Sequence, residues 1–270
     1  FYPGSVLGII TDLTEAIREN DLLRINDLLA QLGKTPFFKH TKPTPYDEAV
    51  SLIWYLENVF YKSFGSIYDY IQQNIFDGKQ INNDIINIGF WPGGDRDGNP
   101  YVTNEITIKV ANLLRDSLIN LYINEIREVR KKITFSDLYE KLEEIEHSLI
   151  KHLNHSKEYK LEKFIRTLTN IKNKLFKKYN GIFADNIEGL LNSINLFGYF
   201  FASIDVRQNR REIIRSLKFI NLKNKKPIDM STQELLSNSK KLTVLSVKDK
   251  TINDTLTSFK MIVYAKVENS

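Results

Sequence analysis

Apolar residues recur at intervals of three and four along most of this chain. Between Val6 and Leu32 the spacing predicts two consecutive helices, and between Ala49 and Phe76 it predicts one long amphipathic helix. Further helices are expected over residues 136–153, 157–179, 186–200 and 249–270. The pattern therefore predicts a mainly α protein.

Several segments mark where helices begin and end. Segment 34–45 holds three prolines, which remove backbone donors and disfavour the α region before them, so it is expected to be a loop. Thr103 is expected to cap a helix that has Glu105 in its first turn. Asp185 and Glu188 have the spacing of a capping box at the start of the last predicted helix before residue 200.

Segment 200–208 differs from its surroundings. Residues 200–206 are rich in aromatic and β-branched side chains, which predicts a short buried strand. Arg207 and Arg210 follow it directly, and the carboxyl ends of strands are where α/β proteins place their chemistry. For these two arginines the simpler interpretation, the solvated start of a helix, is favoured at this point.

Composition narrows the classes of protein to consider. With 270 residues and 42% hydrophobic residues, the chain can form one large domain or two ordinary ones. It has no cysteine and no run of about 18 apolar residues, so a soluble, cytoplasmic protein without membrane contact is expected. The net charge of +5 is spread over lysines that glutamates balance nearby, and no nucleic-acid-binding module is visible.

The polar turn WPGGDRDGNPYVT at 91–103 stands out against the predicted helices. Arg96 lies between Asp95 and Asp97, whose carboxylates could orient its guanidinium toward a phosphate or a planar anion. The turn also contains Gly93, Gly94, Gly98 and Asn99, which favour tight backbone geometry. The same residues could equally form a stiff corner in which Arg96 ties two segments together, and both interpretations stay open here.

The sequence shows no complete catalytic constellation beside this candidate anion site. His147, His152 and His155 lie close in sequence, but their spacing places no metal-binding pair with a carboxylate on one helix face, so they are expected at the surface. The chain also has no nucleophile elbow, phosphate-binding P-loop or dinucleotide fingerprint.

Four segments together resemble one enzyme family. The sequence GGDRDGNPYVT at 93–103 is similar to the GGDRDGNP-x-VT signature of phosphoenolpyruvate carboxylase. In the family's order, KPTPYDEA at 42–49 resembles its [KR]PTP-x-DEA segment, residues 196–198 resemble its TFG element, and SIDVRQ at 203–208 resembles its R-[LI]-D-[IV]-R-Q strand. The resemblance covers essentially the whole chain, with divergent sequence between the motifs.

This resemblance implies a fold, a reaction and site residues. The family has a helix-dominated variant of the eight-stranded α/β barrel, is a homotetramer, and is a carbon–carbon lyase. With magnesium or manganese, it carboxylates phosphoenolpyruvate with bicarbonate to oxaloacetate and phosphate. Carried over, Arg96 contacts the substrate phosphate, Asp95 and Asp97 support it, and Arg207 belongs to the substrate site. Tyr61 falls where many members have a tryptophan near the substrate pocket.

Other family elements have no counterpart in these residues. The catalytic histidine of a TAHPT segment would precede Phe1, and the metal carboxylates and the FHGRGG loop would follow Ser270. We therefore expect residues 1–270 to be a single helical, interior fragment of the enzyme, without a metal site and inactive alone. The alternatives are a stand-alone helical module that binds an anionic metabolite, and a purely structural fragment with a buried turn.

Overall fold

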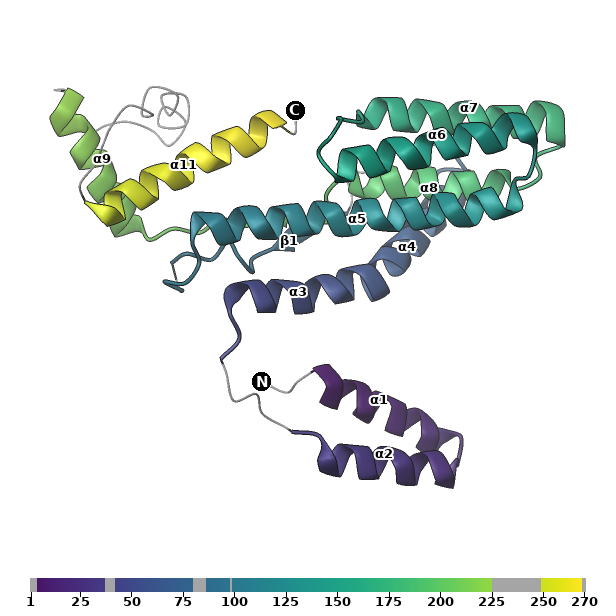
Figure 1. The fold of residues 1–270 in the computed structure, drawn as a ribbon, viewed down its shortest axis with the longest axis horizontal. Coiled ribbons are helices and arrows are strands. Elements are labelled where there is room, and N and C mark those ends of the chain that lie inside the picture. Colours follow the sequence, from purple (N-terminus) through teal and green to yellow (C-terminus); the bar gives the residue numbers. More distant parts are fainter. Residues whose placement is uncertain (1–3, 37–41, 80–85, 98, 225–248, 269–270) are drawn as a thin grey trace.

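The structure is a computed structural model that describes residues 4–36, 42–79, 86–97, 99–224 and 249–268 (Figure 1). Its first two helices, α1 (Gly4–Arg18) and α2 (Leu22–Lys34), confirm the two helices predicted at the amino-terminal end. They form a hairpin that lies apart from the other helices and has its own apolar cluster of Ile9, Ala16 and Leu28.

The described ends of segment 34–45 lack helix between Lys34 and Pro45, as the three prolines predict, while residues 37–41 lie outside the described part. Helix α3 (Pro45–Tyr55) follows. Its capping box pairs Thr44 with Asp47: the Asp47 amide donates to Thr44 Oγ1 at 3.2 Å, and the Thr44 amide donates to Asp47 Oδ2 at 2.9 Å. The loop therefore passes into the helix through a first turn that a capping box closes.

The long helix predicted over residues 49–76 is interrupted. A π-helical turn, η1 (Leu56–Phe60), separates α3 from α4 (Tyr61–Ile75). The amide of Tyr61 donates to the carbonyl of Leu56, five residues back, so the turn is wider than an α-helical one. Such turns bend helices, and the axis changes direction between α3 and α4 in Figure 1.

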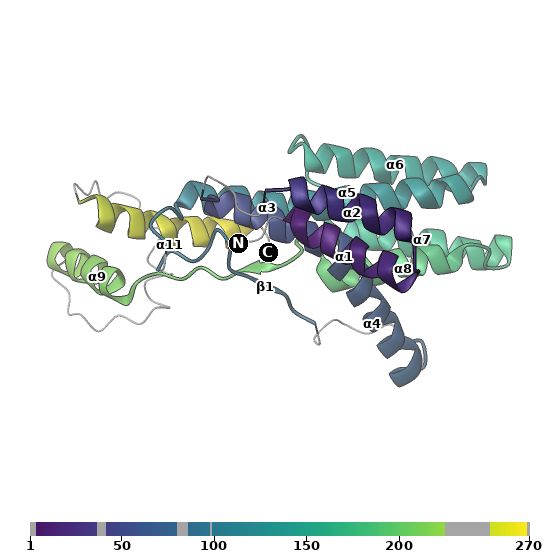
Figure 2. The ribbon, with the colours of Figure 1, turned by 90° about the horizontal axis from the view of Figure 1, so that it is seen from below.

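Helix α5 (Asn104–Lys132) is the central element of the remaining fold. Its side chains Val110, Leu114, Leu118 and Ile126 are buried, as the helical periodicity predicts. Helices α6 (Ser136–Leu153), α7 (Leu161–Tyr179) and α8 (Ala184–Phe197) run alongside its carboxyl-terminal half, as Figures 1 and 2 show. The bounds predicted for α6 are confirmed, whereas α7 begins at residue 161 rather than 157.

The capping box predicted at Asp185 and Glu188 is wrong. Helix α8 begins after Phe183, which has a left-handed backbone with φ of 63° and makes no side-chain cap. Glu188 instead pairs with Lys172 of α7, with 2.9 Å between Lys172 Nζ and Glu188 Oε1. The Glu188 carboxylate, which the local spacing predicted to cap α8, therefore binds a lysine on the neighbouring helix instead.

Two short parallel strands lie at the amino-terminal end of α5. Strand β1 (Gly89–Phe90) pairs with β2 (Ser203–Ile204) in the register Gly89 to Ser203 and Phe90 to Ile204. The strand predicted over 200–206 is confirmed in kind but is shorter and only partly buried, and β1 was not predicted. Helices α9 (Arg210–Asn224) and α11 (Lys250–Glu268) complete this end of the molecule, away from α6, α7 and α8 (Figure 1).

One of the three histidines predicted at the surface is partly buried. His147 and His155 are exposed, but His152 is half-buried, and its ring lies 4.7 Å from that of Tyr199. Its Nδ1 accepts a hydrogen bond from the Tyr159 amide at 3.3 Å, which requires that nitrogen to be unprotonated.

This environment predicts a loss of stability on mild acidification. Burial first, and then the Arg115 charge, lower the pKa of His152 below its ordinary 6.5, against the opposing charge of Glu158. The unfolded chain therefore binds the proton more readily, so this stability is present above the ordinary pKa and is lost as pH falls through and below it. We expect the free energy of unfolding, measured in urea, to decrease between about pH 7 and about pH 5.5.

A matched pair of variants identifies the group. His152→Gln should flatten this pH dependence, whereas His147→Gln, at an exposed position of the same helix, should leave it unchanged. An equal slope in the wild-type protein and His152→Gln would show that other groups are responsible.

Candidate functional site

The signature turn is folded tightly against the first turns of α5. The Gly94 amide donates to the Trp91 carbonyl at 2.9 Å, and Thr107 Oγ1 donates to the Gly93 carbonyl at 2.6 Å. Gly93 has φ of +79°, and a Cβ there would lie 2.6 Å from Val110 Cγ2, so only glycine fits this approach. The turn is thus fixed to the helix that it precedes.

The turn also pairs with the segment after β2. The Arg96 amide donates to the Arg207 carbonyl at 3.0 Å, and the Arg207 amide donates to the Gly94 carbonyl at 3.0 Å. This isolated parallel bridge sets Asp95 beside Arg207, beyond the β1–β2 pairs and in a register shifted by two residues. The structure therefore brings together two sequence-predicted site segments that are far apart in the chain.

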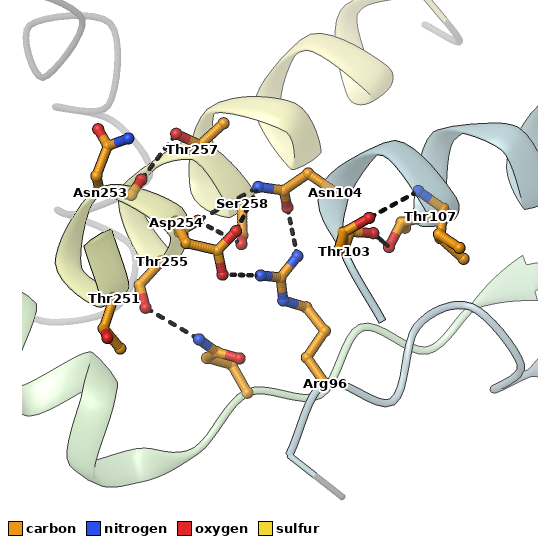
Figure 3. Close-up of polar contacts among 12 residues, drawn as sticks. Arg96, Thr103, Asn104, Thr107, Thr251, Asn253, Asp254, Thr255, Thr257 and Ser258 are labelled. Carbon is orange, nitrogen blue, oxygen red and sulfur yellow. Dashed lines mark hydrogen bonds and ion pairs between the residues drawn. The ribbon is translucent and has the colours of Figure 1, made fainter. Parts of the chain in front are cut away.

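The guanidinium of Arg96 points toward α11 and the amino-terminal end of α5 (Figure 3). Nη1 donates to Asn104 Oδ1 and Nη2 donates to Asp254 Oδ2. The Arg96 side chain is only 4% exposed. Its Nε is buried without a hydrogen-bond partner among the described residues.

The predicted supporting carboxylates do not hold this guanidinium. Asp97 is exposed and Asp95 is half-buried, and within the described part of the chain neither forms an ion pair with Arg96. The carboxylate that pairs with it belongs to Asp254, which sequence reasoning missed. Asn104 was also missed. Its position directly after the predicted N-cap Thr103 was the one sequence feature that could have indicated it.

Arg207 lies on the other side of the extended segment from the contacts to α11. Its side chain is exposed, whereas Gln208 Nε2 donates to Thr255 Oγ1 of α11 at 3.0 Å. Successive side chains of an extended chain point to opposite faces, so Arg207 shares a face with Asp95, and Gln208 shares one with Arg96. The backbones of Arg96 and Arg207 are adjacent, but their side chains face apart.

Tyr61 is buried in the aromatic core. Its ring stacks on Phe197, with 5.4 Å between the centroids, and lies 6.5 Å from the ring of Tyr122 on α5. Burial, and then the charge of Glu125, raise the pKa of Tyr61 well above its ordinary value. The rise along α5 separates Tyr122 from Asn104 by about 27 Å, so the structure does not bring Tyr61 beside Arg96.

The rest of the turn is structural in its visible contacts. Asn99 Oδ1 accepts from the Tyr101 amide at 3.0 Å, and the Asn99 carbonyl accepts from the Val102 amide at 3.1 Å. Thr103 Oγ1 then accepts from the Ile106 amide at 3.3 Å, which confirms the predicted cap of α5. Gly98 lies outside the described residues.

Two features of the described residues bear on other functions. These residues contain no group of three or more histidine, cysteine, aspartate or glutamate residues arranged to hold a metal ion. None of the described helices is long and apolar enough to cross a membrane.

Comparison with known proteins identifies the family. The family model for phosphoenolpyruvate carboxylase matches residues 10–178, which is more than half of the chain and includes the signature turn. This chain belongs to the phosphoenolpyruvate carboxylase family. The family resemblance is thereby confirmed, as is the helix-dominated fold with few, short strands; segments 42–49 and 93–103 lie within the matched residues, and segments 196–198 and 203–208 lie outside them.

Individual phosphoenolpyruvate carboxylases align with different shares of the chain. The enzyme of Shewanella sediminis is 30% identical over 226 residues, which is 79% of this chain and 24% of that protein. The enzyme of Shewanella loihica is 34% identical over 137 residues, and that of Vibrio parahaemolyticus is 29% identical over 131 residues, each alignment covering 15% of the relative. The chain thus spans about a quarter or less of these phosphoenolpyruvate carboxylases.

Proposed function

We propose that this chain is part of a cytoplasmic enzyme that carboxylates phosphoenolpyruvate with bicarbonate, giving oxaloacetate and phosphate. Family membership supports the reaction class, and the small share of each relative that the chain spans supports a partial role. On its own the chain is inactive. In the complete enzyme it belongs to a homotetramer that uses magnesium or manganese held by residues outside those described here.

The part that this chain plays is to supply Arg96 to the phosphate of phosphoenolpyruvate. The observation that carries this assignment is a guanidinium, almost fully buried, on a turn that α5 and the segment after β2 fix from two sides. A preorganised, desolvated cation stabilises negative charge more than a solvated one does, because it needs little reorganisation when that charge develops. Arg207, exposed on the opposite face of the same bridge, is a second substrate contact in this proposal.

A hybrid enzyme tests the proposal. In it, this chain replaces the aligned segment of the Shewanella sediminis phosphoenolpyruvate carboxylase. Formation of oxaloacetate from phosphoenolpyruvate and bicarbonate, with magnesium supplied, is measured for the hybrid and for this chain alone. We expect turnover by the hybrid and none by the chain. A folded hybrid of native mass without turnover would contradict the proposal, as would turnover by the isolated chain.

A further inference from the structure

Asp254 closes the Arg96 site from a distant part of the chain. Arg96 Nη2 donates to Asp254 Oδ2, and the Arg96 side chain is 4% exposed while that of Asp254 is 49% exposed (Figure 3). The half-exposed carboxylate therefore lies between the buried guanidinium and solvent. An anion arriving from solvent meets Asp254 where it would have to bind Arg96.

Asn104 holds both members of this pair. Its Oδ1 accepts from Arg96 Nη1, and its Nδ2 donates to Asp254 Oδ1 at 3.3 Å and to the Asp254 carbonyl at 3.4 Å (Figure 3). Carboxylates and phosphates use the same N–H donors of a guanidinium, so Asp254 occupies Arg96 with the chemistry that a phosphate would use. Asn104 keeps the donors of Arg96 in place when the carboxylate leaves.

Release of Asp254 does not require α11 to unfold or detach. The amides of Thr251 and Ile252 donate to Asp249 Oδ1 at 3.0 and 3.2 Å, so the first turn of α11 is capped independently of Arg96. Thr255 keeps its contact with Gln208, and Ile252 is buried. Rotation of the half-exposed Asp254 side chain is enough to free Nη2.

We propose that Asp254 sets the binding strength that an anion must exceed to occupy Arg96, so that phosphate dianions exceed this threshold and carboxylate monoanions do not. The inference rests on the proposed phosphate-binding role of Arg96. A tethered group competes at an effective concentration that reaches millimolar or more, so a free carboxylate of equal charge does not displace Asp254. A phosphate brings a second charge and further acceptor oxygens, and the unpartnered Nε adds a donor for it.

Competition with Asp254 sets a threshold for binding, and the stronger binding of a phosphate to the guanidinium decides that it passes this threshold. A resident carboxylate imposes the same displacement cost on every anion, so it raises the concentration that each anion needs without changing the ratio of their affinities. Only an anion that binds the guanidinium more strongly than a carboxylate recovers that cost. Removal of the Asp254 charge should therefore tighten the binding of all anions to Arg96 and allow monoanions to bind detectably.

The experiment is a nuclear magnetic resonance titration of this chain with inorganic phosphate or with acetate, following the Arg96 side-chain Nε–H signal. Loss of that signal in Arg96→Lys assigns it. In the wild-type chain, phosphate should shift the signal and acetate should not. In Asp254→Asn, which keeps an acceptor oxygen, phosphate should bind about five- to tenfold more tightly, and acetate should also bind.

Two further variants separate the charge of Asp254 from other effects. Glu105→Gln removes the same charge from an exposed residue in the first turn of α5 and should leave both titrations unchanged. Asp254→Glu keeps the charge and should still exclude acetate. Circular dichroism of each variant shows that the helices are retained.

The possible outcomes separate the inference from the proposal beneath it. Equal phosphate affinity in the wild-type chain and Asp254→Asn, with the Arg96 signal shifting in both, overturns the inference and leaves the phosphate site in place. Weaker phosphate binding in Asp254→Asn also overturns it. If phosphate moves the Arg96 signal in neither protein, Arg96 is not an anion site in this chain, and the proposed role fails together with the inference.

Discussion

Replacing Arg96 with alanine is expected to lower kcat/KM for phosphoenolpyruvate in the hybrid enzyme by roughly 100- to 1000-fold, the usual cost of removing one charge-stabilising donor. The guanidinium is held by Asn104 and Asp254 in a nearly solvent-free position, so its removal takes away a preorganised charge. Arg96→Lys keeps the charge but loses the planar fork of donors, and we expect a smaller loss. Steady-state kinetics with varied phosphoenolpyruvate measure both variants.

The structure also supplies the control for Arg96→Ala. Arg24 lies on α2, in the hairpin apart from the site, and its side chain is 41% exposed beside Glu15 and Glu19. Arg24→Ala removes the same charge and at most a weak surface ion pair, so turnover should stay near the wild-type value. Near-wild-type turnover in Arg96→Ala would instead leave Arg96 a purely structural tie between α5 and α11.

Gly94→Ala is expected to destabilise the fold by about 1–3 kcal/mol through overpacking at the bridge between the turn and the segment after β2. A Cβ at Gly94 would lie 2.4 Å from the Asp205 carbonyl oxygen and 2.7 Å from Ile204 Cγ2. The Asp205 backbone cannot retreat cheaply, because its amide donates to the Phe90 carbonyl at 2.9 Å. Urea unfolding gives the free energy, and amide hydrogen exchange at Asp205 and Arg207 reports the local opening of the bridge.

Gly189→Ala is the matched control for Gly94→Ala. Gly189 lies within α8, and a Cβ there meets nothing within 4 Å. Alanine in an open helical position is expected to stabilise by about 0.5–1 kcal/mol, so the same substitution has opposite signs at the two sites. If Gly94→Ala unfolds at the same urea concentration as the wild-type chain, the close approach of the two segments is not required.

Much of the helical architecture was predictable because its signals are local. Thr103 caps α5, segment 34–45 ends at the start of α3, and α6 occupies the predicted residues 136–153. Each of these boundaries depends on side chains within a few positions of the helix end. Such contacts form wherever the chain folds, so periodicity and capping chemistry identify them.

The predictions that failed depend on groups that lie far away in the sequence. The π turn at 56–60 does not break the apolar pattern, so the bend between α3 and α4 was not foreseen. Strand β1 is two residues long and exists only because β2 pairs with it. Glu188 binds Lys172 on α7 instead of capping α8, because a charge on a packed neighbour competes with a local backbone donor.

For the candidate site, the sequence by itself determined which residues form the signature turn, that its glycines allow a tight backbone, and the family to which they point. Tertiary structure alone decided that Arg96 pairs with Asp254, that its backbone bridges Arg207, and that Tyr61 lies in the aromatic core. Turn geometry and helix caps are short-range effects along the chain. The partner of a buried charge is whatever group the packed helices bring to it, and here that group lies more than 150 residues away.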